Sequence, residues 1–212
     1  MKKNLLITGR PGVGKTTLVM KAIEVSGLNA RGFYTREIRI GGERKGFKVK
    51  TFSGRDCTLG HVEYKGKERV GKYGVDVGSF EAVALPEVAA ALKGCQIIVI
   101  DEIGKMELFS QKFRDLVIMA LDSPYPLLGV IKESGNGFIQ NIKAREDVRL
   151  FHLTMDNRES LLKEILDSMH EGNVRQIGAC GNDAMGTTDF GRSRLSWHGT
   201  RLGDLVRFCP LE

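Results

Sequence analysis

Eight residues near the N-terminus have the composition and spacing of a phosphate-binding loop. The segment Gly9–Thr16 matches the pattern G-x-x-x-x-G-K-[ST]. Its glycines let successive backbone N–H groups turn inward around a phosphate, because no Cβ stands in the way. Lys15 would reach the β- and γ-oxygens of a nucleotide and act in catalysis, and the Thr16 hydroxyl would ligate Mg²⁺. We expect nucleotide contacts from the loop and the residue after it: Gly9, Arg10, Pro11, Gly12, Val13, Gly14, Lys15, Thr16 and Thr17.

A second group of chemically useful residues follows an apolar run in the middle of the chain. Asp101 and Glu102 come directly after Ile97–Ile100. An acid at the end of a buried strand would stand beside the phosphate loop, where Asp101 would hold the Mg²⁺. Glu102 would point toward the γ-phosphate and polarise an attacking water as a general base. We expect nucleotide contacts along the whole segment: Ile97, Ile98, Val99, Ile100, Asp101, Glu102, Ile103 and Gly104.

Phosphoryl transfer also requires a cation that meets the charge developing on the γ-phosphate. Lys105 follows the acidic pair closely enough to serve as this catalytic cation. Arg36, Arg39 and Arg69 are alternatives, and for each of these residues a solvated surface charge is the competing interpretation.

Two further residues lie where the last strand of the expected sheet meets its helix. Asn157 or Arg158 could contact the base or ribose there, because such folds bind ligands beyond the carboxyl ends of their strands. The alternative is a helix cap with a surface arginine. Asp101–Gly104 also satisfies D-x-x-G, but the guanine-reading N-K-x-D is absent from the chain, so guanine selectivity is not supported.

The elements that must position these residues can be read from the hydrophobic pattern. Strands are expected at 4–8, 96–101, 127–131 and 148–153, and helices at 15–26, 111–121, 138–145 and 157–169. Two shorter helical segments are expected at 79–84 and 87–92, separated by Pro86. Alternating segments at 32–40 and 45–52 flank Gly41-Gly42, which predicts an antiparallel hairpin, and 57–64 would add a third strand.

This alternation predicts an α/β protein with the P-loop NTPase fold, a mostly parallel sheet flanked by helices, with an antiparallel β-hairpin insertion. We expect one domain over residues 1–167, with the insertion at about 32–76. Glycines interrupt every possible element after residue 172, so we expect 168–212 to be a loosely structured C-terminal extension.

Composition narrows the class of protein. No apolar run is long enough to span a membrane, so we expect a cytoplasmic or nuclear protein. We also expect it to be a monomer. The four cysteines form no C-x-x-C pair, which argues against a metal or redox centre built from them. The net charge of +6 is spread diffusely; it leaves a nucleic-acid partner open without indicating one.

Taken together, the motifs resemble the THEP-type nucleoside-triphosphatase family over about residues 1–166. The similarity is carried by 12–17, 32–35, 46–47, 75–76, 80–81, 99–108 and 157–158. It implies a small Mg²⁺-dependent enzyme that hydrolyses ATP, GTP and other nucleoside triphosphates to the diphosphate and phosphate, with low base selectivity. The segment 132–138 is less similar to the vertebrate branch than to other branches of the family, and the tail after about Ser168 resembles none of them.

Two other functions remain open at this stage. A nucleoside or nucleotide kinase shares the phosphate loop and parallel sheet, although no arginine-rich lid segment is evident. A nucleotide-gated module that binds RNA, DNA or a protein is compatible with the basic excess and the hairpin. Hydrolysis is the interpretation that we prefer, because Glu102 suits water better than a sugar hydroxyl.

Overall fold

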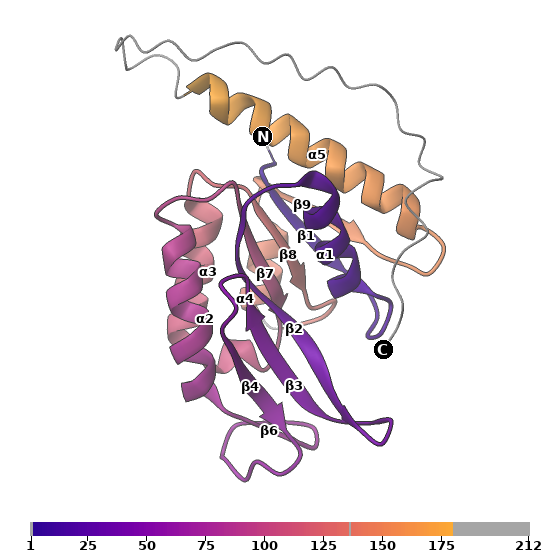
Figure 1. Ribbon diagram of the computed structural model, residues 1–212, viewed down its shortest axis with the longest axis vertical. Coiled ribbons are helices and arrows are strands. Elements are labelled where there is room, and N and C mark those ends of the chain that lie inside the picture. Colours follow the sequence, from indigo (N-terminus) through magenta and orange to yellow (C-terminus); the bar gives the residue numbers. More distant parts are fainter. Residues whose placement is uncertain (1, 136, 180–212) are drawn as a thin grey trace.

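A single sheet runs through the part of the chain that the structure describes (Figure 1). The computed structural model describes residues 2–135 and 137–179. The strands are β1 (Asn4–Thr8), β2 (Ala30–Ile40), β3 (Glu43–Thr51), β4 (Asp56–His61), β5 (Arg69–Val70), β6 (Tyr73–Val75), β7 (Ile97–Ile103), β8 (Leu127–Ile131) and β9 (Val148–His152). Their order across the sheet is β5-β6-β4-β3-β2-β7-β8-β1-β9. The ladders among β2, β7, β8, β1 and β9 are parallel, and those from β2 outward to β5 are antiparallel.

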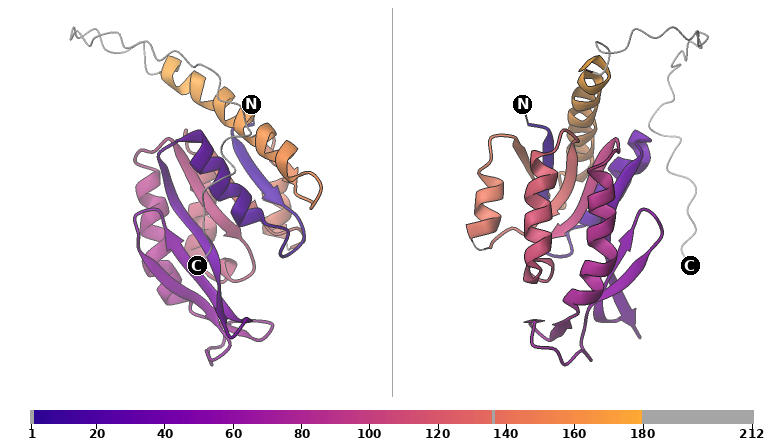
Figure 2. Two further views of the ribbon diagram at one scale, coloured as in Figure 1. Left: turned by 45° about the vertical axis from the view of Figure 1, so that its right-hand side comes forward. Right: turned by 90° about the vertical axis from the view of Figure 1, so that its left-hand side faces the viewer.

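Helices cover both faces of the sheet (Figures 1 and 2). They are α1 (Lys15–Ser26), α2 (Val77–Ala91), α3 (Gln111–Asp122), α4 (Gly137–Lys143) and α5 (Arg158–Ala179), with a short 3₁₀ turn η1 (Glu107–Phe109). Val19 of α1 and Ile165 of α5 belong to one hydrophobic core, and Phe80 of α2, Phe113 of α3 and Ile142 of α4 belong to the other. The sheet therefore lies between two helical layers, as a mostly parallel sheet requires.

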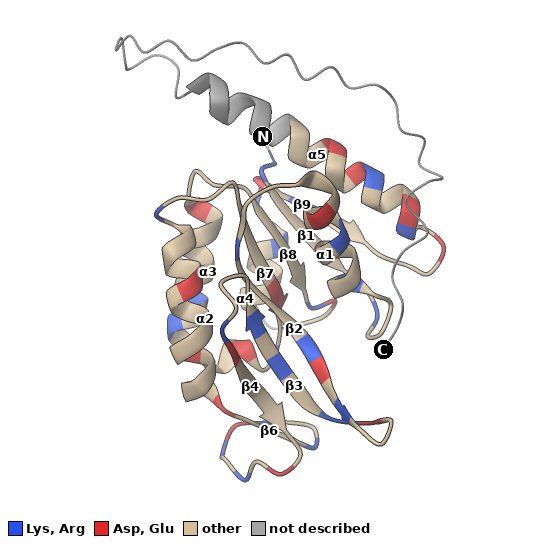
Figure 3. Ribbon diagram, viewed as in Figure 1, with Lys and Arg blue, Asp and Glu red and all other residues tan. Residues whose placement is uncertain are grey.

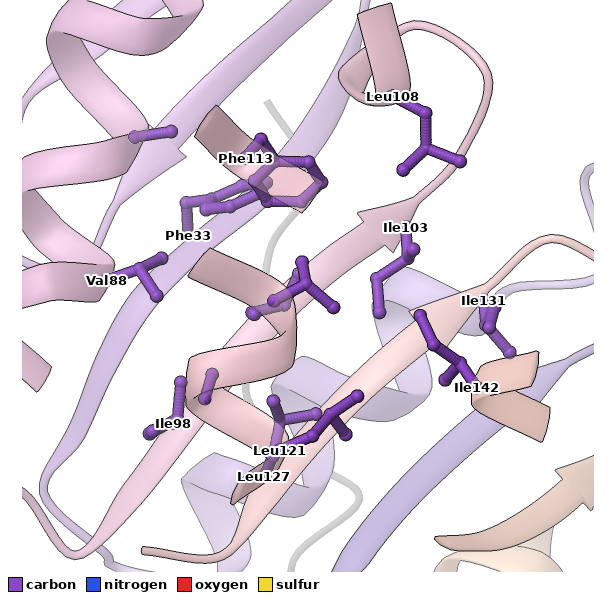
Figure 4. Packing of buried hydrophobic residues seen from close by; sticks show 14 of the residues in the cluster. Phe33, Val88, Ile98, Ile103, Leu108, Phe113, Leu121, Leu127, Ile131 and Ile142 are labelled. Atoms are coloured by element: carbon purple, nitrogen blue, oxygen red, sulfur yellow. The ribbon is translucent and has the colours of Figure 1, made fainter. Parts of the chain in front are cut away.

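An aromatic cluster fixes the helical layer of α2 and α3 on the sheet. The rings of Phe33, Phe80 and Phe113 are fully buried, with centroids 5.1 to 5.9 Å apart. Figure 4 shows Phe33 and Phe113 in this packing beside Val88. Each aromatic pair of this kind contributes about 0.5–1.5 kcal/mol beyond the burial of its surface. The cluster holds β2, and so the start of the antiparallel extension, in a defined position.

The predicted fold is confirmed, with one difference at the hairpin. β2 and β3 form the expected antiparallel hairpin around Gly41 and Gly42, which both have positive φ. The first half of β2 also pairs in parallel with β7, from Ala30 opposite Ile97 to Phe33 opposite Ile100. This strand therefore belongs to both the central sheet and the extension, and the pair β5–β6 adds an outer edge that the pattern did not predict.

Two helices differ from the prediction. α2 is continuous from Val77 to Ala91 with Pro86 inside it, so the separation into two segments is wrong. Its buried residues Ala84, Val88 and Ala91 pack on the sheet on both sides of the proline, and this burial outweighs the missing hydrogen bond. α5 continues to Ala179, past the predicted end at 169, so the proposed boundary between 167 and 168 falls within a helix.

The expected loose extension lies mostly at 180–212, outside the described residues. Among the residues that the structure describes, no helix has both the length and the apolar character needed to cross a membrane.

Candidate active site

The phosphate loop links β1 to α1 through glycines in left-handed conformations. Gly12 and Gly14 have φ values of 79° and 97°, which L-residues with a side chain rarely adopt. Gly9 has φ 146°, and a Cβ there would lie 2.5 Å from the carbonyl oxygen of Leu153. The loop can take this path only with glycine at these positions. Its last residue stands at the N-terminus of α1, where the helix dipole favours an anion.

Lys15 and Thr16 open α1 and direct their side chains to the same side of the loop. The Lys15 ammonium donates to the carbonyl oxygens of Gly9 and Arg10, at 2.8 and 3.0 Å, which holds it across the loop. The Thr16 hydroxyl faces the Asp101 carboxyl. Because β8 lies between β1 and β7, the two motifs meet across an intervening strand and not on adjacent ones.

Asp101 lies at the carboxyl end of β7 with no exposed surface. Neither of its carboxylate oxygens makes a hydrogen bond of full geometry among the described residues, although the Thr16 hydroxyl and the Thr35 N–H lie close enough to act on its charge. Burial raises the pKa of Asp101 to about 7, and the Thr16 hydroxyl, the Thr35 N–H and the charge of Lys15 oppose this shift. A buried carboxylate with both oxygens unbonded fits a metal ion, whose charge would compensate its desolvation.

Glu102 is turned toward the phosphate loop by an irregularity in β7. The pairing of β7 with β8 shifts register between Asp101 and Ile103, so these two residues pair with the consecutive Val130 and Ile131. Burial raises the pKa of Glu102, while the charges of Lys15 and Lys132 lower it. A raised pKa brings a glutamate closer to the range in which a general base works near neutral pH.

A third acid, Glu107, lies beside Glu102. A Cβ on Gly104 would lie 2.7 Å from an oxygen of Glu102 and 2.9 Å from one of Glu107, so the two carboxyls flank this glycine. Glu107 is 5% exposed, and burial, followed by the charge of Glu102, raises its pKa well above the usual value. The Gly104 N–H is a hydrogen-bond donor to it. Nothing in the sequence pattern pointed to Glu107.

Apart from Asp101, which is buried behind the surface, these residues line one cavity of about 870 Å³. The phosphate loop contributes Gly9, Pro11, Gly12, Gly14, Lys15 and Thr16. The ends of the neighbouring strands contribute Thr35, Glu102, Lys105, Glu107 and Lys132, and the antiparallel extension contributes Arg36, Glu37, Arg39, Arg44, Phe47, Leu59 and Tyr73. The structure therefore brings together Lys15, Thr16, Glu102 and Lys105, four of the residues with a predicted chemical role.

Two lysines in this cavity are candidates for the catalytic cation. Lys105 is exposed and Lys132 half-buried, and neither ammonium has an acidic partner within 4 Å among the described residues. The charge of Lys132 also lowers the pKa of Glu102. Lys132 was missed in the sequence, although its place directly after the buried strand β8 is the usual position of a site residue in a parallel sheet.

Several expected contact residues do not line the cavity. Ile97, Ile98, Val99, Ile100 and Ile103 are at most 1% exposed, and their side chains pack in the two cores. Their role is structural: they hold β7 in the sheet and so fix the positions of Asp101 and Glu102 at its end. Val13 is buried in the core and Thr17 is exposed on α1. Arg10 contributes its carbonyl to Lys15, and Gly104 separates the two glutamates.

Asn157 and Arg158 are engaged elsewhere than in the cavity. Asn157 accepts from the Thr154 N–H at 2.8 Å and donates to the His152 carbonyl at 2.8 Å, so it closes the turn between β9 and α5. Arg158 donates to the Val13 carbonyl at 2.9 Å and packs against Gly14, on the outer side of the phosphate loop. A contact with the base or ribose remains a prediction.

Comparison with known proteins assigns the chain to a family. A family model described as NTPase matches residues 4–166. The chain belongs to this NTPase family. It is 46% identical over 162 residues to nucleoside-triphosphatase THEP1 of Thermotoga petrophila, covering 76% of this chain and 90% of that relative. It is 44% identical over 182 residues to the human cancer-related nucleoside-triphosphatase, covering 78% and 96%.

Two solved structures of NTPase relatives have the same fold. The crystal structure of THEP1 from Aquifex aeolicus matches with a TM-score of 0.73 and 39% identity, covering 78% of this chain and 98% of that one. The solution structure of the human cancer-related nucleoside triphosphatase matches with a TM-score of 0.68 and 44% identity, covering 79% and 97%. The expected hydrolysis of nucleoside triphosphates is thus the activity of the family, and it is the activity of this NTPase.

Proposed function

We propose that this NTPase hydrolyses ATP, GTP and other nucleoside triphosphates to the diphosphate and phosphate, with Mg²⁺ and with low base selectivity. Glu102 is the general base in this proposal, Lys15 binds the β- and γ-phosphates, and Lys105 or Lys132 meets the charge on the γ-phosphate. The single observation that carries the proposal is the convergence of Lys15, Thr16, Glu102 and the two lysines on one cavity.

Asp101 and Thr16 would hold the Mg²⁺. A fully buried carboxylate with two unbonded oxygens facing a hydroxyl is a donor set of the hard oxygen type that Mg²⁺ prefers. When bound with the nucleotide, the ion would neutralise charge on the β- and γ-phosphates. One carboxylate and one hydroxyl are enough, because Mg²⁺ usually completes its shell with phosphate oxygens and water.

In this proposal Glu102 takes a proton from water. Its half-buried side chain lines the same cavity as Lys15 and is kept apart from Glu107 by Gly104. As water attacks the γ-phosphorus, the bond to the β–γ bridging oxygen breaks and the diphosphate leaves. Lys15 can then stabilise the charge on the leaving oxygen, because its ammonium lies over the loop that cradles the phosphates.

Low base selectivity is supported by what lies on the other side of the loop. The chain lacks the guanine-reading N-K-x-D motif. The polar groups of Asn157 are already used in the turn that precedes α5, and Arg158 is bonded to the loop itself. Asn157 and Arg158 are thus anchored in the turn and on the loop backbone, and the chain offers no motif for one base in their place.

Phosphate release from ATP, GTP, CTP and UTP, measured with and without Mg²⁺, tests this function. We expect release from all four nucleotides within about tenfold of each other, and loss of release with a chelator. A kinase would be nearly silent with ATP alone, because it needs its acceptor. Release from only one nucleotide would contradict the proposed selectivity.

The role of Glu102 is tested by Glu102→Gln. The substitution keeps the shape but cannot accept a proton, so we expect turnover to fall by about 10² to 10⁴ while nucleotide binding is retained. Glu133→Gln is the matched control, since Glu133 also lines the cavity but its carboxylate faces His152 at 3.8 Å. Wild-type turnover in Glu102→Gln would remove the general-base assignment.

A further inference from the structure

The cavity extends beyond the phosphate loop, along the antiparallel extension of the sheet. In the sheet, β9 and β1 lie on one side of β7, and β2, β3, β4 and β6 lie on the other. The phosphate loop follows β1, and Glu102 of β7 marks the place of the γ-phosphate in the proposed function. The part of the cavity along the antiparallel extension lies beyond that place, so the phosphates of the nucleotide leave it free.

That part of the cavity is rich in cations. Arg36, Arg39 and Arg44 line it together with a single carboxylate, Glu37. Glu37 forms ion pairs with Arg39 and Arg44, at 2.6 and 2.7 Å. Arg36 has no acidic partner within 4 Å in the described part of the chain, and its guanidinium lies over the Tyr34 ring at 5.5 Å. Figure 3 shows that basic positions are frequent along β2 and β3, with an acidic position between those on β2.

Arg44 is held in a fixed geometry at the centre of this wall. It donates to Glu37 at 2.7 Å and to the Tyr73 hydroxyl at 3.0 Å. Its guanidinium lies 5.3 and 5.9 Å from the ring centroids of Phe47 and Tyr73, which also line the cavity. A preorganised guanidinium loses little rotamer entropy when it binds an anion, and its planar fork matches a phosphate.

The two ends of the free space differ in chemistry. Toward β7 it meets the carboxyls of Glu102 and Glu107, which can accept hydrogen bonds from a ligand hydroxyl. Toward β3 it meets the arginines. Lys105 and Lys132, both without an acidic partner in the described residues, also line the cavity. A molecule with a hydroxyl at one end and a phosphate at the other is complementary to both ends.

We propose that the cavity along β2, β3 and β6 binds a second, phosphate-bearing small molecule, a phosphomonoester, beside the γ-phosphate of the nucleotide. Arg39 and Arg44, which both flank Glu37, bind its phosphate group. This inference rests on the proposed function only for the place of the γ-phosphate; the volume and the lining charges are properties of the cavity itself.

Binding to the nucleotide-loaded protein tests the site. The full chain is saturated with Mg²⁺ and a non-hydrolysable ATP analogue, which blocks the phosphate loop. Inorganic phosphate, ribose 5-phosphate and AMP are then titrated in separate calorimetric experiments, with ribose as the probe that lacks a phosphate. We expect at least one phosphate-bearing probe to bind and ribose not to bind.

Substitutions locate that binding. We expect Arg44→Gln to weaken it by about tenfold, the effect of losing one charge-assisted hydrogen bond. Lys48→Gln is the matched control: it removes one cation and one ion pair from the same strand, but Lys48 does not line the cavity. Arg39→Gln repeats the test at a second arginine of this wall, whose side chain is more than half exposed, so it should not disturb folding.

The outcomes separate this inference from the proposed function. Absence of binding by all three phosphate-bearing probes, or binding that neither Arg44→Gln nor Arg39→Gln weakens, would overturn the second site. Phosphate release from ATP in the absence of any probe reports on the proposed function alone. A protein that hydrolyses ATP but binds no probe keeps the function and loses the site.

Discussion

At the scale of single residues, the carboxyls of Glu102 and Glu107 are separated by a glycine without a positive φ. Gly104 is buried, and a Cβ on it would fall within 3 Å of oxygens from both glutamates. The atoms in the way are ends of side chains, which can move without a change in the backbone. Gly104→Ala should therefore displace the general base more than it disturbs the fold.

For Gly104→Ala we expect turnover to fall by at least tenfold, as small displacements of catalytic groups do, with a melting temperature close to that of the wild type. Phosphate release and thermal unfolding measure the two effects. Gly137→Ala is the control, since nothing lies within 4 Å of a Cβ at that position. A large loss of stability in Gly104→Ala would mean that the backbone, and not the carboxyls, makes the close contact.

Glu107 makes stability depend on pH. Burial raises its pKa well above 4.5 in the folded protein, so the folded state holds this proton at pH values at which the unfolded chain has lost it. Stability is therefore greatest below the unfolded pKa and falls as pH rises toward the folded pKa. One pKa unit corresponds to about 1.4 kcal/mol.

Glu107→Gln removes this ionisation while keeping a hydrogen-bond acceptor for the Gly104 N–H. We expect it to be more stable than the wild type by about 1 kcal/mol or more at pH 7, and equal to it near pH 4. Urea unfolding at the two pH values measures the difference. Glu24→Gln, at an exposed position of α1, serves as the control. A constant difference at both pH values would show that ionisation is not the cause.

At the scale of elements, α2 retains a proline in its interior. Pro86 is exposed and cannot donate the hydrogen bond to the carbonyl four residues earlier. We expect Pro86→Ala to restore that bond and to stabilise the protein by about 1 kcal/mol, the helical gain being partly offset by greater freedom of the unfolded chain. Thermal unfolding measures it. Destabilisation would instead show that the bend at the proline is needed for α2 to pack on the sheet.

At the scale of the whole molecule, the buried hydrophobic residues whose side chains the structure describes, in 2–135 and 137–170, run from Leu5 to Met169. They form the two cores on either side of the sheet. We expect a chain that ends at Ala179 to unfold within about 2 °C of the full chain, because it retains all of these core residues. It should release phosphate from ATP at the same rate, and a slower rate would assign a role in catalysis to 180–212.

Local features of the fold could be predicted from the sequence, whereas features that depend on distant contacts could not. Gly9–Thr16, β1, α1 and β8 could be placed from the order of residue types alone, because a glycine loop, a buried strand and a capped helix are determined by neighbours in the chain. The continuity of α2 through Pro86 could not be predicted, because packing on the sheet decides it. The length of α5 could not be predicted either, because the ends of helices are weakly marked in sequence.

The sequence by itself determined that this protein has a phosphate loop, an acidic pair at the end of a buried strand, and a parallel α/β sheet with an antiparallel extension. Only the tertiary structure decided that Glu107 flanks Glu102, that Lys132 lies beside them, and that Arg44 is stacked on Phe47 and Tyr73 at the far end of the same cavity. These residues come from separate elements, so their proximity depends on the order and register of the strands. Local sequence does not determine that order, because many pairs of apolar strands could form equally good ladders.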